Sequence, residues 1–329
     1  MSDATMRAAV ATPDGMAIRE VPRPAPKPNE VLVKVRYSGL NRADLAGAAY
    51  DPKATAPIIS GTDWSGDVVA VGSEVAGGYK PGDRVMCSGR GGYAEYAATD
   101  WGRVLPVPRN VSMREAGTLM VAMQTMHDAL VTHGQLVRGD TVLIQGASAG
   151  VGLLGMQIAK LLGARVVIGT ATNAERRARL AEYGCDVALD SNDPGWVQAA
   201  LDATGGRGVD IAVDQVAGKT VNPLMNAMAL LGRIVNVGRL GGASGELDFN
   251  LHALKRLSYI GVTFRTRNLQ EVREITRKAR TDLWEALESR KLRLPLDRTF
   301  PLGAIRDAHD HMRNNRHFGK ILVEIAGEG

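Results

Sequence analysis

Cysteine is almost missing from this chain of 329 residues, which contains only Cys87 and Cys185. The two stand far apart, so they offer neither a disulfide framework nor the paired spacing of a structural zinc site. The chain also lacks an apolar run near twenty residues, which excludes a membrane-spanning helix, and its first residues show no secretory signal. We therefore expect a soluble globular protein of the cytoplasm with no membrane partner.

The chain also lacks a long run of residues that carry the same charge. The net charge is +5, yet basic and acidic residues alternate, most densely over 265–298. Such mixing is typical of solvated helix faces with i,i+4 pairs and not of a nucleic-acid-binding patch. We expect no nucleic-acid partner.

The pattern of apolar residues and turn residues changes near residues 115–125. Before this point, short apolar runs punctuated by proline and glycine indicate a compact antiparallel β domain. After it, strands alternate with helices, which predicts βαβ units and a parallel doubly wound sheet. The expected strands are 141–145, 164–169, 186–190, 209–216, 232–238 and 258–264, and the expected helices include 113–131, 174–184, 196–205 and 222–231.

Glycines gather where strand 141–145 turns into a helix, in DTVLIQGASAGVGLLGMQIAK (140–160). A dinucleotide-binding βαβ unit needs small residues there, for the tight turn, for close approach of a diphosphate and for helix packing. Two frames fit, namely Gly150, Gly152 and Gly155, or Ala147, Ala149 and Gly152. We prefer the second because its turn directly follows the strand, so that the N–H groups of Gly150 and Val151 face the phosphates.

The end of the next strand predicts which dinucleotide is bound. An NAD site would place Asp or Glu there, whereas this chain has Thr170 and Thr172 followed by Arg176 and Arg177. Hydroxyl and guanidinium groups without a carboxylate suit a 2′-phosphate, so we predict NADP(H). At least one arginine of 176–179 is expected to belong to a solvated helix face.

These residues, together with LNRADL (40–45), PIISGTDWSGDVVAVGSEVAGGYKPGDRV (57–85), GGYAEYA (91–97) and RHFGKILVEI (316–325), resemble the zinc-independent, zeta-crystallin-like quinone oxidoreductases of the medium-chain dehydrogenase/reductase superfamily. The similarity covers essentially the whole chain. It implies an α/β protein with a GroES-like β-rich catalytic domain over 1–120, completed by 265–329, and a Rossmann NADP(H)-binding domain over 121–264. It also implies an active-site cleft between the domains and a homodimer formed by the edges of the Rossmann sheets.

The same resemblance argues against a catalytic metal. In the zinc alcohol dehydrogenases a cysteine stands where Asn41 stands, and a histidine and a glutamate stand at Thr62 and Asp63. All the ligand positions are changed together, so we expect no metal. The histidines offer no substitute set, because we expect them on the surface; those considered are His127, His133, His309, His311 and His317.

The resemblance also implies roles for single residues. Asn41 and Asp44 match the family's Asn-x-x-Asp near the nicotinamide, although a capping role for Asp44 is an equal alternative. Tyr50 is a weaker candidate for a phenol that donates a hydrogen bond to the substrate, since Ala46 occupies the usual tyrosine position. Further cofactor contacts are implied for Thr125, Gly238, Phe264 and Phe318 or Lys320, and 2′-phosphate contacts for Thr172 and Arg176.

Without a metal, we expect hydride transfer from NADPH to a quinone or an enone conjugated to a carbonyl. An enoyl-thioester or 2-alkenal reductase remains an alternative, in which Arg239 or Arg265 would bind a thioester's phosphates. Two more hypotheses stay open, namely a metal-free alcohol dehydrogenase and a non-catalytic protein that binds NADPH or RNA.

Overall fold

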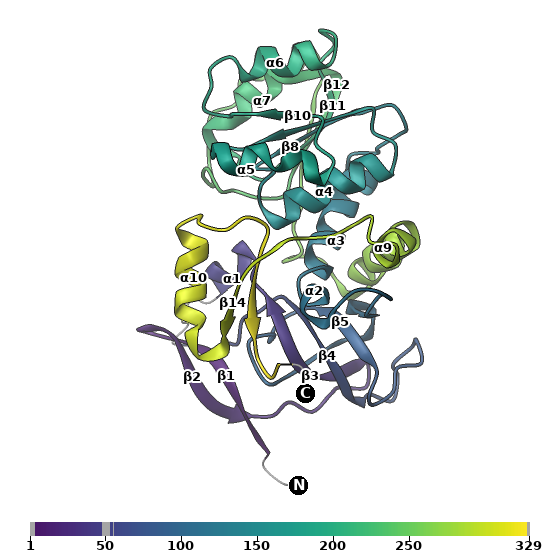
Figure 1. The fold of residues 1–329 in the computed structure, drawn as a ribbon, viewed down its shortest axis with the longest axis vertical. Helices are drawn as coiled ribbons and strands as arrows, with labels where there is room; N and C mark the ends of the chain where they lie inside the picture. The colour runs from purple at the N-terminus through teal and green to yellow at the C-terminus, as the bar shows by residue number, and fades with distance from the viewer. Residues whose placement is uncertain (1–3, 48–52, 55, 328–329) are drawn as a thin grey trace. The chain divides into compact units, whose positions relative to one another are not determined.

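The structure is a computed structural model that describes residues 4–47, 53–54 and 56–327. The chain forms two compact units, unit 1 (Met1–Val121 and Asn268–Gly329) and unit 2 (Ala122–Arg267) (Figure 1). The chain therefore leaves unit 1, builds unit 2 and returns to unit 1. The boundaries expected from the sequence were 120/121 and 264/265.

Unit 1 is a β-rich body. Its strands are β1 (Thr5–Thr12), β2 (Gly15–Pro22), β3 (Glu30–Gly39), β4 (Asp63–Val71), β5 (Arg84–Ser88), β6 (Tyr96–Asp100), β7 (Val104–Pro106), β14 (Leu296–Pro301) and β15 (Lys320–Glu324). Its helices are α1 (Arg42–Gly47), α2 (Met113–Ala116), α9 (Leu269–Glu288) and α10 (Ile305–Arg313), with 3₁₀ turns η1 (Trp101–Arg103) and η5 (Leu302–Ala304).

The main sheet of unit 1 has the order β14-β15-β3-β4-β5-β7, with β6 also paired to β3, while β1 and β2 form a separate hairpin. β15 pairs antiparallel with β3, so that Leu322 faces Gly39. Alternating apolar residues of β3 and β4, such as Val31, Val33 and Trp64, are fully buried and hold the sheet on its core. The last strand of the chain thus lies beside the end of β3.

Unit 2 contains a six-stranded parallel sheet. Its strands are β8 (Thr141–Gln145), β9 (Val166–Thr170), β10 (Val187–Leu189), β11 (Val209–Asp214), β12 (Met228–Asn236) and β13 (Ser258–Gly261). Its helical segments are α3 (Met120–His127), the π-helix η2 (Asp128–His133), α4 (Gly150–Leu161), α5 (Ala174–Ala178), η3 (Leu180–Tyr183), α6 (Trp196–Ala203), η4 (Gly218–Thr220), α7 (Val221–Ala227) and α8 (Phe249–Lys255). α3 begins two residues before the unit boundary.

The strand order of unit 2 is β10-β9-β8-β11-β12-β13. The chain runs outward in one direction from β8 to β10 and then in the other direction from β11 to β13, with α4 and α5 on one face and α6 and α7 on the other (Figure 1). The order therefore reverses between β8 and β11. In open parallel sheets, ligands bind at the carboxyl ends of the strands next to such a reversal.

Several expected elements differ from those observed. The helix expected over 113–131 is interrupted after α2, because the carbonyl of Gly117 accepts the N–H of Gly39 instead of continuing a helix. The helix expected over 222–231 ends at Ala227, and the following residues are extended and belong to β12. The strand expected over 258–264 stops at Gly261.

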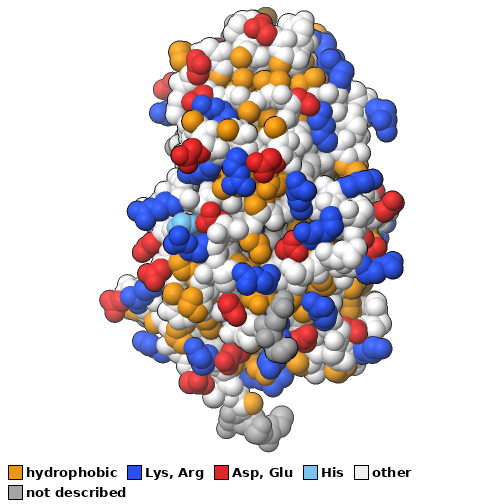
Figure 2. Space-filling model, in the orientation of Figure 1, with side chains coloured by type: hydrophobic (Ala, Val, Ile, Leu, Met, Phe, Trp, Pro, Cys, Tyr) orange, Lys and Arg blue, Asp and Glu red, His pale blue; other side chains and the backbone are white. Residues whose placement is uncertain are grey.

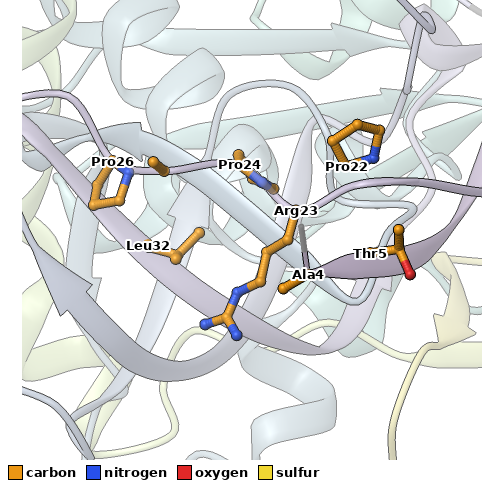
Figure 3. Close-up of a pocket in the computed structure, with 8 residues that line it drawn as sticks. Ala4, Thr5, Pro22, Arg23, Pro24, Pro26 and Leu32 are labelled. Atoms are coloured by element: carbon orange, nitrogen blue, oxygen red, sulfur yellow. The ribbon is translucent and has the colours of Figure 1, made fainter. Parts of the chain in front are cut away.

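In the part of the chain that the structure describes, no helix combines the length and the apolar character needed to cross a bilayer. A surface depression of unit 1 is lined by the proline-rich segment 22–26 together with Leu32 (Figure 3). The Arg23 guanidinium there lies 3.7 Å from the centre of the Tyr96 ring. None of the residues that border this depression belongs to the site described next.

Candidate active site

Asn41 and Asp44 lie where β3 gives way to α1. A Cβ at Gly39 would lie only 2.6 Å from Gly117 O, so glycine is needed at the end of this strand. The backbone N–H of Asn41 donates to Asp44 Oδ2 at 2.8 Å, and the N–H of Asp44 donates to Asn41 O at 2.9 Å. This exchange orders the first turn of α1 and holds both side chains in the interior.

Lys320 places a buried ammonium beside Asn41. It is the first residue of β15, and its Nζ donates to Asn41 Oδ1 at 2.8 Å and to Asp63 Oδ2 at 3.3 Å. The side chains of Lys320 and Asp63 are 3% and 0% exposed, so the ion pair has almost no contact with solvent. The hydrogen bonds that the ammonium donates to both acceptors offset the cost of burying the charge.

Two further groups complete this arrangement. Asn41 Nδ2 donates to Thr62 Oγ1 at 3.2 Å, and the buried Tyr93 hydroxyl donates to Asp44 Oδ2 at 3.0 Å. We call these six residues the Asn41 cluster: Asn41, Asp44, Thr62, Asp63, Tyr93 and Lys320. All of them belong to unit 1.

Burial controls the protonation of the cluster. It raises the pKa of Asp63 to about 6, against the lowering effect of the neighbouring Lys320 ammonium. Burial also raises the pKa of Asp44, although the Asn41 N–H, Thr62, Tyr93 and Lys320 all favour its carboxylate form. The pKa of the Tyr93 phenol is raised, first by burial and then by the adjacent Asp44. Tyr93 therefore acts in this cluster as a neutral hydrogen-bond donor.

In unit 2, the glycine turn follows β8 directly. Gly146 has φ +75°, and α4 begins at Gly150 with Ala149 as its N-cap. The N–H of Leu153 donates to Ala149 O at 2.9 Å, so the N–H groups of Gly150, Val151 and Gly152 precede the first bond of the helix and have no acceptor within it. These three donors point out from the positive end of the helix dipole, which suits a phosphate.

Gly152 permits the close packing of this turn. A Cβ at this residue would lie 2.7 Å from Ala147 O and 2.8 Å from Ala147 Cα. Gly155, the last glycine of the other frame, lies inside α4, where a Cβ would meet Met126 Sδ at 2.8 Å. Gly152 belongs to both frames, so its contact with Ala147 does not choose between them, while Gly155 lets α4 pack against Met126 of α3.

The loop after β11 meets the same turn, and the loop after β12 packs against the loop after β11. Gln215 Nε2 donates to Gln145 O at 3.1 Å and to Gly146 O at 3.2 Å. Gly238 approaches Gln215 so closely that a Cβ would lie 2.6 Å from its carbonyl oxygen. Gly238 therefore lies at the carboxyl edge of the sheet, beside the reversal point of the strand order.

The hydroxyl and basic residues after β9 have different surroundings. Thr170 is buried and its hydroxyl accepts the N–H of Gly146 at 3.3 Å, whereas Thr172 is exposed and Arg176 is half-buried. Arg177 is committed elsewhere, to Asp190 at 3.0 Å and to Ala171 O at 2.9 Å. That Thr172 and Arg176 contact a 2′-phosphate stays a prediction.

The remaining predicted site residues are scattered. Thr125 is half-buried on α3, and Phe264 is half-buried in the segment after β13, where the Arg267 guanidinium lies 5.7 Å from its ring centre. Phe318 is buried just before β15. Tyr50 lies outside the residues that the structure describes, so its role stays a prediction.

The expectation that the histidines lie on the surface is wrong. His127 and His309 are each 1% exposed, and His317 is 8% exposed. His309 shares the buried face of α10 with Ile305, Ala308 and Met312, so it takes a core position of that helix. Among the described residues, no group of three or more His, Cys, Asp and Glu side chains could hold a metal ion.

Sequence reasoning missed four members of the site. Thr62 and Asp63 were noticed only as replacements of metal ligands, and Tyr93 only as part of the GGYAEYA stretch. Gln215 was not singled out, although a polar residue directly after a buried strand of a parallel sheet is a usable signal. Asp190 was also missed as a neighbour of the β9 end, because it follows the adjacent strand β10.

Comparisons with known proteins match both parts of the chain. The family described as alcohol dehydrogenase GroES-like domain matches residues 27–109, and the family described as zinc-binding dehydrogenase matches residues 150–279. Quinone oxidoreductase-like protein 2 of Bos taurus is 30% identical, with 94% of this chain and 89% of that protein covered. Quinone oxidoreductase of Rattus norvegicus is 28% identical, with 91% and 90% covered.

A much longer relative also matches. A phenolphthiocerol/phthiocerol polyketide synthase subunit of Mycobacterium tuberculosis is 30% identical over 96% of this chain, which spans 14% of that relative's length. Among solved structures, an alcohol dehydrogenase superfamily protein from Novosphingobium aromaticivorans is 30% identical, with a TM-score of 0.86 and 98% and 100% of the two chains covered. An NAD-dependent alcohol dehydrogenase is 28% identical, with a TM-score of 0.85 and the same coverage.

Proposed function

Because this chain belongs to the quinone oxidoreductase-like family of the medium-chain dehydrogenase/reductase superfamily, we propose that it is a metal-free reductase that uses NADPH to transfer hydride to quinones or similar conjugated carbonyl acceptors. The relatives named quinone oxidoreductase support the acceptor class. The proposal that the enzyme uses no metal is supported by one observation. The Lys320 ammonium donates hydrogen bonds to Asn41 and Asp63, at the positions that correspond to metal ligands.

Zinc does not fit the Asn41 cluster. Catalytic zinc takes three protein ligands from thiolate, imidazole and carboxylate groups. The corresponding positions here carry an amide, a hydroxyl and a carboxylate, and the carboxylate of Asp63 is already paired with an ammonium. A divalent cation at this place would be repelled by Lys320, so the reaction is derived without one.

A nicotinamide dinucleotide fits unit 2. The N–H groups of Gly150, Val151 and Gly152 form a cradle for a diphosphate, and the missing side chain of Gly152 lets helix and turn approach. Thr172 and Arg176 support the choice of NADPH, since a hydroxyl and a guanidinium suit its 2′-phosphate. Asp190 lies near this end of the sheet but is neutralised by Arg177.

NADPH, when bound, supplies the hydride and its electron pair. The residues of this chain bind the cofactor, shape the place of reaction and stabilise the oxyanion that forms. We assign Asn41 and Asp44 to shaping the site and Tyr50 to hydrogen bonding with the oxyanion, while solvent supplies the proton. Neither Asp44 nor Tyr93 is offered as the proton donor, because both are buried and bonded to each other.

Reduction of an enoyl thioester or a 2-alkenal is the second candidate. Arg239 and Arg265 are both exposed, on the loops that follow β12 and β13, and neither is paired with a carboxylate of the described residues. Free guanidinium groups at this edge are suited to the phosphates of a thioester carrier. The likeness to part of a polyketide synthase favours testing this candidate directly.

We also propose a homodimer located in the cytoplasm, without nucleic acid as a partner. The edge strand β13 exposes Tyr259, and Phe249 and Leu254 of the preceding helix α8 are 75% and 70% exposed. A bare strand edge with apolar neighbours is typically covered by another chain. On the face shown in Figure 2, cations and anions are interspersed, which supports the absence of a nucleic-acid surface.

The test is oxidation of NADPH by the pure, EDTA-treated protein. 9,10-Phenanthrenequinone and 1,4-benzoquinone are compared with crotonyl-CoA and 2-hexenal, and each assay is repeated with NADH. Quinone turnover with NADPH preferred is the expected result, and Arg176→Ala should then weaken NADPH about tenfold while sparing NADH. Turnover of the thioester or alkenal alone would move the assignment to ene reduction. NADPH binding without any turnover would leave a binding protein.

A further inference from the structure

Asn41 occupies the N-cap position of α1 but does not cap it. An asparagine at this position normally uses its side-chain oxygen to accept an N–H of the first helical turn. Here only the reverse half of the exchange is present, because the N–H of Asn41 donates to Asp44 Oδ2 at 2.8 Å. The Asn41 side-chain oxygen is turned away from its helix and accepts the Lys320 ammonium at 2.8 Å.

The ammonium fixes which way round the Asn41 amide lies. An amide presents an acceptor at one end and a donor at the other, and the two orientations have nearly the same shape. An ammonium has donors alone, so the amide atom that faces Lys320 must be the oxygen. The nitrogen is thereby directed to Thr62 Oγ1 at 3.2 Å and to Gly39 O at 3.4 Å.

Asp63 keeps this ammonium in place. Its carboxylate lies 3.3 Å from Lys320 Nζ, and neither side chain has appreciable access to water. A lone buried ammonium would lose its proton or move to solvent, whereas the pair holds it at a fixed point. The Lys320 ammonium therefore donates to two acceptors inside unit 1. Because its side chain is also buried, it is poorly placed to contact a cofactor.

We propose that Lys320 is a positioning residue that locks the orientation of the Asn41 amide, and that it does not bind the cofactor. Asn41 then always directs its NH₂ group, and never its carbonyl oxygen, to Thr62 Oγ1 and Gly39 O, so the amide holds the residue before β4 against the end of β3. This inference rests on the proposed function, because Asn41 is assigned there to shaping the site of hydride transfer.

The test compares two substitutions of Lys320. Lys320→Arg keeps a group that can only donate, whereas Lys320→Gln fills similar space with an amide that pairs with either end of Asn41. We expect Lys320→Gln to lower kcat for 9,10-phenanthrenequinone about ten- to hundredfold, with the Kd for NADPH changed less than twofold. Lys320→Arg should restore most of kcat. Lys278→Gln, which removes an exposed ammonium of α9, is the matched control.

Coupling shows whether Lys320 acts through Asn41. In an Asn41→Ala background, the further change Lys320→Gln should alter kcat less than twofold. Equal losses in both backgrounds would overturn the proposal, as would a large rise in the Kd for NADPH in Lys320→Gln. A loss in thermal stability with kcat unchanged would show a purely structural role.

A spectroscopic readout separates failure of this proposal from failure of the proposed function. The side-chain NH₂ resonances of Asn41, assigned by their disappearance in Asn41→Asp, should move in Lys320→Gln and hold their position in Lys320→Arg. This result is available even if the wild-type protein reduces none of the acceptors. Unmoved Asn41 resonances in Lys320→Gln would contradict the proposal.

Discussion

Ala217 has a backbone conformation that belongs to glycine. Its φ of 58° and ψ of −154° lie in a region that a Cβ makes unfavourable by about 1–3 kcal/mol. The conformation is held because the N–H of Ala217 donates to Asp214 Oδ1 at 2.9 Å, at the end of β11. Strain is thus stored at the carboxyl edge of the Rossmann sheet, where the loop must bend sharply.

Replacing this alanine should relieve the strain. We expect Ala217→Gly to raise the free energy of unfolding by about 1 kcal/mol, measured by urea denaturation, because relief of strain exceeds the added flexibility of the unfolded chain. Ala178→Gly, at an exposed helical position of α5, should lower it by about 0.5–1 kcal/mol. Destabilisation by both substitutions would contradict the assignment of strain.

Two buried residues of unit 1 give stability opposite dependences on pH. Burial raises the pKa of Asp63 to about 6, so its contribution is complete below about pH 4 and is lost as pH rises through 6. Burial lowers the pKa of His309 to about 4, so its contribution is complete above about pH 6.5 and is lost as pH falls through 4. The two effects oppose each other across this interval.

Single substitutions should separate the two effects. On acidification from pH 7 to pH 4, His309→Gln should gain stability relative to wild type by about 3 kcal/mol, and Asp63→Asn should lose a similar amount. The measurement is urea unfolding at a series of pH values, in which slopes and not absolute stabilities are compared. A pH dependence of His309→Gln parallel to that of wild type would show that His309 is not a neutral core residue.

At the scale of elements, a lysine ends α7. Lys255 Nζ donates to Met225 O at 3.1 Å, Asn226 O at 2.7 Å and Met228 O at 2.8 Å. The Met225 and Asn226 carbonyls lie in the last turn of α7, at the negative end of the helix dipole, and Met225 O also accepts the N–H of Met228. The ammonium therefore stabilises the point at which α7 ends and β12 begins.

Loss of this cap should weaken unit 2. Lys255→Met keeps the aliphatic stem and removes the three hydrogen bonds, so we expect the free energy of unfolding to fall by about 1–3 kcal/mol in urea denaturation. Lys278→Met is the control, since its contact with Glu274 at 3.8 Å is exposed and should contribute little. Equal effects of the two substitutions would refute a capping role.

The end of α7 could not be predicted from the sequence. The apolar residues of 222–231 fit one helical face, and the capping lysine lies 27–30 residues further along the chain. By contrast, the period of each strand and helix predicted the α/β fold class correctly. The Ala147 frame was preferred because its turn directly follows β8. Gly152 belongs to both frames, so its close contact leaves the choice between them a prediction.

The candidate site was predicted less completely than the fold. Asn41 and Asp44 follow a recognisable strand end, whereas the side-chain partners of Asn41 are Thr62, just before β4, and Lys320, the first residue of β15. The resemblance implied a cofactor contact for Phe318 or Lys320, which stays a prediction. The bond from Lys320 to Asn41 could not be predicted, because RHFGKILVEI says nothing about an acceptor 279 residues away. Pairings of this kind depend on sheet order, which local patterns do not contain.

At the scale of the whole molecule, the proposed homodimer gives a prediction. Placing a charge on the exposed edge, as in Tyr259→Asp combined with Leu254→Asp, should convert dimers to monomers in sedimentation velocity runs. Val137→Asp, at a residue of unit 2 that is 60% exposed, is the control and should leave the mass unchanged. A dimer that survives the double substitution would place the interface elsewhere.

The insertion of unit 2 into unit 1 has a consequence for synthesis on the ribosome. The glycine turn of unit 2 is built from neighbouring residues, whereas the bond between Asn41 and Lys320 joins segments on either side of the inserted unit. A nascent chain must therefore hold β3 without β15 beside it while all of unit 2 is translated. Until β15 emerges, the Tyr37–Gly39 end of β3 is open to pairing with other chains, while β6 already covers Glu30–Lys34.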